Sequence, residues 1–157
     1  MKPIQLKVPV LLWRRLLQQL RKRGGGKRES GAFLMGKPGS TRISRFICYD
    51  DLDESALETG IITFHAAGFV KLWGICAREK LKVLADVHTH PSDWTGQSNS
   101  DQTHPMIALS GHIALILPDF ARNAKSSLTG AGIYEYLGNH EWKTWSIKSG
   151  RVKITLL

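Results

Sequence analysis

One short apolar run that is closed by a proline constrains the fold most. Leu81 to Val87 is mostly apolar and leads directly into His88-Thr89-His90-Pro91. A run of this length is typical of a buried strand, and Pro91 ends the strand because proline has no N–H to give to a neighbouring strand. A buried strand needs cover on both faces of its sheet. We therefore expect a layered fold in which this strand carries two histidines to one end of the sheet.

Two amphipathic segments are predicted to provide the cover. Leucines recur at helical spacing over residues 8–23, arginines and lysines fall largely elsewhere, and glycines 24–26 stop the helix. Residues 61–80 repeat apolar side chains at the same interval, over a length that favours a helix. Residues 50–58 and 119–130 are expected as loops. Shorter apolar runs predict strands over residues 30–35, 42–49, 112–117, 132–137, 142–147 and 151–157, with a short helix over 101–109.

The sum is an α+β domain in which a mixed β-sheet is packed between an N-terminal helix and a central helix. The 157 residues, 42% hydrophobic and 22% charged, suit a single domain over residues 1–157. No apolar run is long enough to span a membrane, and Arg14 and Arg15 interrupt the first apolar stretch, so no signal peptide is expected. We expect a cytoplasmic protein in which Cys48 and Cys76 are buried thiols.

The positive charge of the chain is concentrated at its N-terminus. Residues 1–28 hold nine lysines and arginines and no acid, whereas residues 29–157 hold 13 residues of each sign. The formal net charge of +9 therefore comes entirely from the first segment. Such a segment is either a solvated helix face or a docking surface for phosphates or an acidic protein, because one-sided charge attracts oppositely charged partners. The sequence alone leaves these interpretations open.

Three candidate metal ligands lie between residues 88 and 101. In an extended strand residues i and i+2 project to the same face, so His88 and His90 can offer two imidazoles to one ion, and the following loop can return Asp101. This ligand set suits Zn2+ and leaves a fourth position for water, as in catalytic zinc sites. Hydrolysis there also needs a donor to the oxyanion and a proton acceptor. Ser98 can supply the donor, and Glu29, at the start of a predicted strand, is one candidate for the acceptor.

These residues follow the spacing of a known motif. His88-x-His90-Pro91, six residues, Ser98, two residues and Asp101 resemble the JAMM motif of the JAB/MPN metalloprotease family without insertion. The upstream segment Glu29-Ser30-Gly31-Ala32-Phe33-Leu34-Met35-Gly36 is similar to the glutamate strand of that family. Together with the order of the intervening elements, the resemblance covers roughly residues 29–117.

The resemblance implies an MPN/JAB-like, cytidine-deaminase-like fold with one catalytic Zn2+ whose fourth ligand is water. His88, His90 and Asp101 would bind the zinc ion. Glu29 would take the proton from the zinc-bound water and pass it to the leaving amine, and Ser98 would stabilise the oxyanion. The implied reaction is cleavage of an isopeptide or peptide bond after the C-terminus of a ubiquitin-like protein.

Other residues near the motif are weaker candidates. His104 lies close to the third ligand and is a candidate hydrogen-bond partner for it, because metal ligands usually have outer partners. Trp94 lies in the motif loop and is a candidate substrate contact. His65 and His112 are expected to be packed or solvated, and Asp93 does not fit the motif.

The expected partners are a ubiquitin-like protein and its conjugates. Compact stand-alone chains such as this one resemble the prokaryotic branch of the family. This resemblance implies further partners, namely E1-like and E2-like proteins encoded in the same bacterial antiviral operon. A second interpretation is a protease that trims the precursor of a ubiquitin-like or sulfur-carrier protein. A third, from another class, is a nucleic-acid-binding module that uses the basic N-terminal helix, by analogy with RadC-type domains. Nucleic acid is the less favoured partner, and no membrane is expected.

Overall fold

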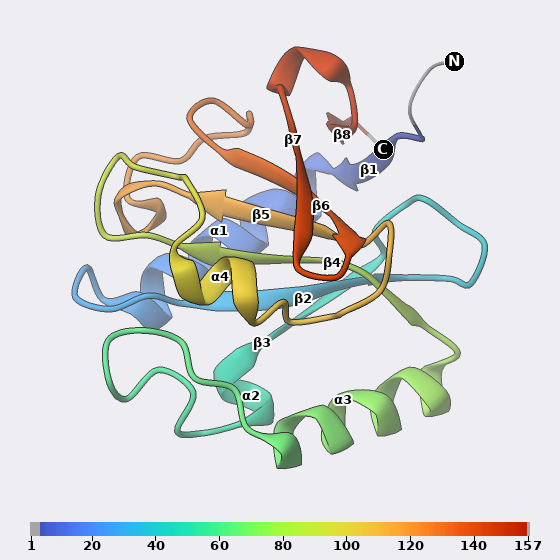
Figure 1. The fold of residues 1–157 in the computed structure, drawn as a ribbon, viewed down its shortest axis with the longest axis horizontal. Coiled ribbons are helices and arrows are strands. Elements are labelled where there is room, and N and C mark those ends of the chain that lie inside the picture. Colours follow the sequence, from blue (N-terminus) through green and yellow to red (C-terminus); the bar gives the residue numbers. More distant parts are fainter. Residues whose placement is uncertain (1–3, 157) are drawn as a thin grey trace.

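The computed structural model describes residues 4–156 and places a six-stranded sheet at the centre (Figure 1). The elements are β1 (Leu6–Pro9), α1 (Val10–Gly24), β2 (Gly31–Gly36), β3 (Arg45–Cys48), α2 (Tyr49–Leu52), α3 (Ala66–Glu79), β4 (Lys82–Thr89), α4 (Asn99–Thr103), β5 (Ile113–Leu117), η1 (Asp119–Ala121), β6 (Gly132–Gly138), β7 (Glu141–Trp145), η2 (Ile147–Ser149) and β8 (Val152–Thr155). The strand order is β3-β2-β4-β5-β6-β7, and β1 and β8 form a separate parallel pair.

The sheet is mixed, and its one parallel pair decides where the functional residues meet. β4 and β5 run parallel, whereas the other neighbouring strands of the sheet are antiparallel. The carboxyl ends of two parallel strands lie at the same edge of a sheet. The residues that follow β4 and those that follow β5 therefore leave the sheet side by side, as Figure 1 shows.

The buried strand β2 shows how alternation builds the two layers. Ala32 and Leu34 belong to the core cluster that contains the buried face of α1, whereas Phe33 and Met35 belong to the cluster that contains α2 and α3. The buried side chains that α1 contributes are Trp13, Leu16, Leu17 and Leu20. The predicted fold class, a mixed sheet between an N-terminal helix and a central helix, is confirmed.

The N-terminal helix begins later than predicted. Residues 6–9 form β1 instead, and Val8 is buried in that strand. The helix then starts directly after Pro9, since proline fits a helix start, where N–H groups have no helical acceptor. Its end agrees with the prediction, because Gly25 adopts the left-handed conformation (φ 58°) that glycine accepts without a steric cost.

The central helix is also shorter at its start. α3 begins at Ala66, and residues 61–65 are not helical. The Asp53 carboxylate accepts a hydrogen bond from the backbone N of His65 at 2.9 Å, which satisfies an amide at the helix start. Phe64 packs edge-on against Phe33 with ring centroids 5.3 Å apart. Ile62 and Phe64 are thus partly buried against the core cluster beside the sheet, without forming a helical turn.

Two smaller predictions were wrong at their boundaries. The helix expected over residues 101–109 is α4 at Asn99–Thr103, because Pro105 disfavours helical backbone at the preceding His104. The loop expected over residues 50–58 begins with α2. Both cysteines are free and buried, as predicted. Within residues 4–156, no helix has the length and apolar character to cross a membrane.

Candidate active site and metal centre

β4 carries the two predicted histidines to one end of the sheet. Val87 faces the core under α1, so Asp86 and His88 project from the opposite face of the strand. His90 lies just beyond the last residue of β4, and its backbone N donates to the Leu117 carbonyl at 2.8 Å, which continues the pairing with β5. The rings of His88 and His90 are buried, with centroids 5.0 Å apart.

A capping box at the start of α4 returns Asp101 to the histidines. Ser98 is the N-cap residue, and its Oγ accepts a hydrogen bond from the Asp101 backbone N at 3.0 Å. In return, Oδ2 of Asp101 accepts from the Ser98 backbone N at 2.9 Å. This reciprocal pair fixes the Asp101 side chain against the first turn. The two-residue gap between serine and aspartate in the motif is therefore also the spacing of a helix cap.

The three predicted ligands converge with the dimensions of a zinc site. Nε2 of His88 lies 3.2 Å from Nε2 of His90, and Nε2 of His90 lies 3.2 Å from Oδ2 of Asp101. The third edge, from Nε2 of His88 to Oδ1 of Asp101, is 3.4 Å. Around a tetrahedral zinc ion with bonds of about 2.0–2.1 Å, two ligand atoms lie about 3.3–3.4 Å apart. Both the donor types and their spacing fit a metal ion.

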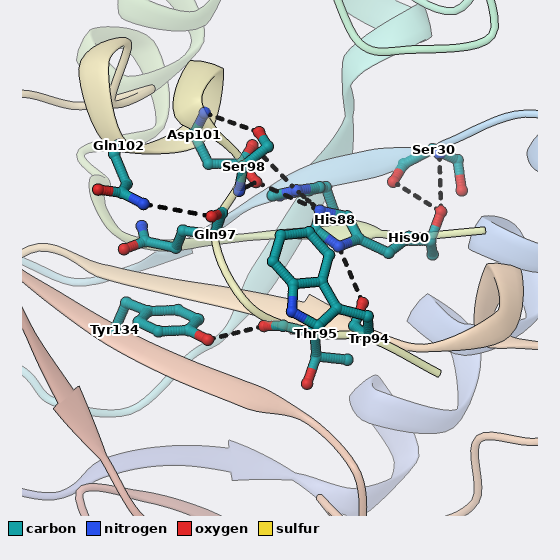
Figure 2. Close-up of polar contacts among 11 residues, drawn as sticks. Ser30, His88, His90, Trp94, Thr95, Gln97, Ser98, Asp101, Gln102 and Tyr134 are labelled. Carbon is teal, nitrogen blue, oxygen red and sulfur yellow. Dashed lines mark hydrogen bonds and ion pairs between the residues drawn. The ribbon is translucent and has the colours of Figure 1, made fainter. Parts of the chain in front are cut away.

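Trp94 determines which nitrogen of His90 faces this triangle. Nδ1 of His90 lies 3.1 Å from the Trp94 carbonyl oxygen, which can only accept a hydrogen bond. Nδ1 therefore carries a hydrogen, and Nε2 is the nitrogen that faces Asp101 and that would ligate a metal ion once it gives up its own hydrogen. The Trp94 ring also stacks on the same imidazole, with centroids 5.4 Å apart, as Figure 2 shows.

Neighbouring donors keep the third ligand charged. Burial disfavours an ionised carboxylate, but the imidazoles of His88 and His90 and the amide of Ser98 outweigh it and hold the pKa of Asp101 well below its usual value. The Asp101 carboxylate is therefore ionised at neutral pH and can serve as an anionic ligand.

Glu29 reaches the same site from the start of β2. It lies two residues before that strand, and its backbone N donates to the Gly60 carbonyl at 2.8 Å. Burial raises the pKa of the Glu29 carboxyl, and the nearby His88 and His90 act in the opposite direction. A partly desolvated carboxylate beside a cluster of imidazoles suits the transfer of a proton.

These groups line one side of a cavity of about 620 Å³. The polar side contains the Glu29 carboxyl, His88, Ser98 and Asp101. The rest of the lining is largely apolar and comes from several elements: Ile61, Ile62, Phe64, Phe69, Pro105, Met106, Ala114, Ile116 and Trp142. The cavity thus combines the candidate catalytic and ligand residues with a largely apolar lining.

Two aromatic residues that the sequence reasoning missed hold the motif loop in place. Oη of Tyr134 donates to the Thr95 carbonyl at 2.7 Å, as drawn in Figure 2. Nε1 of Trp142 donates to the Gln102 carbonyl at 3.0 Å and so ties α4 to β7. Both lie about 40 residues after their partners, so no local signal in the sequence indicates them.

The weaker candidates occupy different positions around the site. His104 is exposed and lines the cavity, but its Nδ1 lies 2.9 Å from Oγ1 of Thr103, and in residues 4–156 it makes no hydrogen bond to the three ligands. Trp94 is 55% exposed, so one part of its ring stays open to a substrate. His65 is exposed beside Asp53. The roles of His104 and Trp94 stay predictions.

A buried polar group lies on the sheet behind the predicted ligands. Nε2 of His112 lies 2.7 Å from Oδ2 of Asp86, and both side chains are almost fully buried. The Tyr49 hydroxyl is buried near this pair and has no hydrogen-bond partner of normal geometry in the described part of the chain. Burial and the nearby Asp86 carboxylate raise the pKa of Tyr49. His112 is therefore packed rather than placed among the metal ligands, as predicted.

Comparison with known proteins supports the fold. No protein-family model matches the chain. The solution structure of protein DSY2949 from Desulfitobacterium hafniense is similar over 95% of this chain and 92% of its own, with 13% identity and a TM-score of 0.61. AF2198, a JAB1/MPN domain protein from Archaeoglobus fulgidus, is similar over 90% of this chain and 94% of its own, with 16% identity and a TM-score of 0.50. The chain therefore has a JAB1/MPN-like fold.

Proposed function

We propose that this chain is a zinc-dependent isopeptidase or peptidase that removes a ubiquitin-like protein from its targets by cleaving after the C-terminus of that protein. One observation carries the proposal: His88, His90 and Asp101 converge with zinc-like spacing, and His88 and Asp101 line one cavity together with Ser98 and Glu29. This cluster matches the set of residues that the JAMM-like spacing assigns to hydrolysis. A purely structural pair of histidines needs neither the convergent aspartate nor the adjacent glutamate.

The residues of the candidate site support a specific position for a zinc ion. His88, His90 and Asp101 would hold a zinc ion through Nε2, Nε2 and the carboxylate. A bound zinc ion would act as a Lewis acid on the scissile carbonyl and make a water nucleophilic at neutral pH. The remaining steps belong to side chains of the chain itself.

Glu29 and Ser98 complete the reaction. The Glu29 carboxylate would accept a proton from the attacking water and deliver it to the leaving amine. The Ser98 Oγ accepts from the Asp101 amide, so its own hydrogen is free to be donated to the oxyanion. The Glu29 carboxylate can thus accept a proton, and the Ser98 hydroxyl still has a hydrogen to donate.

The cavity is suited to the end of a protein chain. Its volume of about 620 Å³ exceeds that of a single side chain, and apolar residues line it together with the proposed ligands His88 and Asp101. An extended C-terminal tail can lie there with its last carbonyl at the metal, whereas the folded part of the modifier stays outside. Conjugates made by E1-like and E2-like proteins of a bacterial operon are the substrates that we favour.

Substrate trapping tests the proposal. Glu29→Ala removes the proton acceptor and leaves the three ligands, so we expect bound zinc to be retained and turnover to fall by about 100-fold or more. The variant is used to capture partners from native lysate, and mass spectrometry identifies them. Glu58→Ala, at an exposed acid, is the matched control that should keep full activity.

The captured species distinguishes the outcomes. A ubiquitin-like protein joined to a target, and released when wild-type enzyme is added, supports the isopeptidase. An unconjugated precursor that wild-type enzyme shortens supports precursor maturation instead. Full activity of Glu29→Ala, or loss of its zinc, would contradict the proposed role of this residue.

A further inference from the structure

Two segments that are distant in sequence build one positively charged surface. The first is α1 with the turn that follows it, and the second is the loop of residues 119–131 after β5. We use the name basic surface for their exposed cations Arg14, Arg15, Arg21, Lys22, Lys27, Arg28, Arg122 and Lys125.

Specific hydrogen bonds hold the two segments together. Nε of Arg14 donates to Oγ of Ser126 at 2.9 Å, and Nε of Arg21 donates to the Ala121 carbonyl at 2.7 Å. Nε1 of the buried Trp13 donates to the Lys125 carbonyl at 3.1 Å. The loop is therefore seated on the helix by its backbone, and the cations of both segments are gathered in one place.

The basic surface is not neutralised from within. Residues 10–28 contain no acid, and Asp119 is the one acid in residues 119–131. The acids of the neighbouring α2 interact with a different cation, because Arg23 contacts Asp50 at 3.0 Å and Asp51 at 2.7 Å. Arg23 is therefore left out of the basic surface.

This surface continues into the candidate active site. Arg28 directly precedes the proposed proton acceptor Glu29. On the other segment, the Phe120 backbone N donates to the carbonyl of the proposed ligand His90 at 2.8 Å. Figure 1 shows the end of α1 and the loop after β5 at the same end of the sheet as the end of β4. A protein with its tail in the cavity therefore lies within reach of the basic surface.

We infer that the basic surface docks an acidic face of the protein substrate and so adds affinity that the cavity alone does not provide. The inference rests on the proposed function for the identity of the partner as a protein. The local chemistry favours protein over single-stranded nucleic acid, which is usually bound by exposed aromatic rings. Trp13 is fully buried and Phe120 half-buried, so these segments offer no such platform. Exposed charges of this kind mainly set association rate and specificity.

Charge reversal tests the inference without any catalytic readout. The first variant combines Lys22→Glu, Arg122→Glu and Lys125→Glu, none of which touches the proposed ligands, Ser98 or Glu29. Its control combines Lys82→Glu, Lys148→Glu and Lys153→Glu, which change the net charge equally at exposed positions on other elements. The probes are a fluorescein-labelled peptide of twelve glutamates and a labelled 20-base-pair DNA duplex, titrated at low and at physiological salt.

We expect the wild-type chain and the control to bind the acidic peptide with similar affinity, and the first variant to bind about tenfold or more weakly at low salt. Equal binding by the two triple variants would overturn the inference. Tighter binding of the duplex than of the peptide, lost only in the first variant, would overturn it in favour of a nucleic-acid surface.

The same variants separate this inference from the proposed function. If the isopeptidase is established by trapping, the first variant should show a raised KM and an unchanged kcat on the captured conjugate. If the chain fails the trapping test but still binds the peptide through the basic surface, the proposed function is contradicted. The basic surface would then bind an acidic partner of another kind.

Discussion

The lining of the cavity has two parts, a ligand wall and an apolar wall, whose side chains are positioned in different ways. The ligand wall comes from the end of β4 and the start of α4, with Glu29 from just before β2, whereas the apolar wall comes from residues 61–64, α3, residues 105–106, β5 and β7. On the ligand wall, local rules fix the side chains: strand alternation aligns His88 with His90, and a helix cap orients Asp101. On the apolar wall, only contacts between distant segments decide which residues face the cavity. The three proposed ligands are thus positioned by local sequence, whereas the apolar lining of the cavity is not.

The largest expected effect is on the ligand wall. Asp101→Ala removes one of three ligands and should lower bound zinc from about one per chain to near zero after dialysis, because a structure with two imidazoles alone holds the ion weakly. Elemental analysis measures the stoichiometry. Asp93→Ala, at an exposed acid of the same loop, is the matched control and should retain the metal. Unchanged zinc in Asp101→Ala would remove this residue from the ligand set.

Ser98 is expected to have the next largest effect. Ser98→Ala removes the proposed oxyanion donor and should lower kcat by about 100-fold. It also removes the helix cap, which should cost about 1 kcal/mol of stability. Ser98→Thr keeps a hydroxyl for both roles and should restore much of the activity. If Ser98→Thr and Ser98→Ala are equally inactive, while both bind zinc, the hydroxyl is not the donor.

A change on the apolar wall should alter substrate binding and leave the metal in place. A Cβ added at Gly68 would lie 2.5 Å from the Phe64 ring, so Gly68→Ala should displace that ring from the cavity wall at a cost of about 1–3 kcal/mol. We expect a KM raised severalfold with zinc stoichiometry unchanged. Gly74→Ala, on the same helix but with open space around it, should stabilise the chain by about 0.5–1 kcal/mol. Loss of zinc in Gly68→Ala would show that the two walls are not separable.

The smallest expected effect concerns the support of the apolar wall. The Asp53 carboxylate accepts hydrogen bonds from the backbone N and Oγ of Ser55 and from the backbone N of His65, and these outweigh burial and lower its pKa. Asp53→Asn should therefore cost about 1 kcal/mol at pH 7, as the loss of a helix cap does.

The pH dependence of this cost has a definite sign. Because the folded-state pKa of Asp53 lies below that of the unfolded chain, near 3.9, its stabilisation is present above about pH 4 and is lost as the pH falls through the folded-state value. Urea unfolding at a series of pH values should show the difference between wild type and Asp53→Asn shrinking in acid. Glu54→Gln, at an exposed neighbour, should show little difference at any pH. If the difference in unfolding free energy between wild type and Asp53→Asn stays constant down to pH 2, the stabilisation by Asp53 does not depend on its charge.

The same contrast explains which parts of the fold and of the candidate site could be predicted from the sequence. The sheet between two helices was predictable because β2 and β4 are apolar and α1 is amphipathic. The segment over residues 61–65 was mistaken for the start of a helix because Phe64 continues the helical interval of the apolar residues that follow, but Phe64 packs against Phe33 outside the helix. Tyr134 and Trp142 carry no local signal, since their partners Thr95 and Gln102 lie about 40 residues earlier. The motif indicated Glu29 and the three proposed ligands, but it did not indicate Tyr134 and Trp142, which hold the motif loop and α4 in position.

The attachment of Glu29 to the loop that carries part of the apolar wall has an evolutionary consequence. The Glu29 amide binds the Gly60 carbonyl, so the contact joins two backbone groups. The loop is also closed at its ends through Asp53 and His65. Side chains between those ends that are not part of the core, such as the exposed Ile61, can therefore be exchanged by mutation without altering either contact. If the proposed function holds, selection can change which modifier is bound through this loop, while Glu29 and the proposed ligands stay under separate constraint.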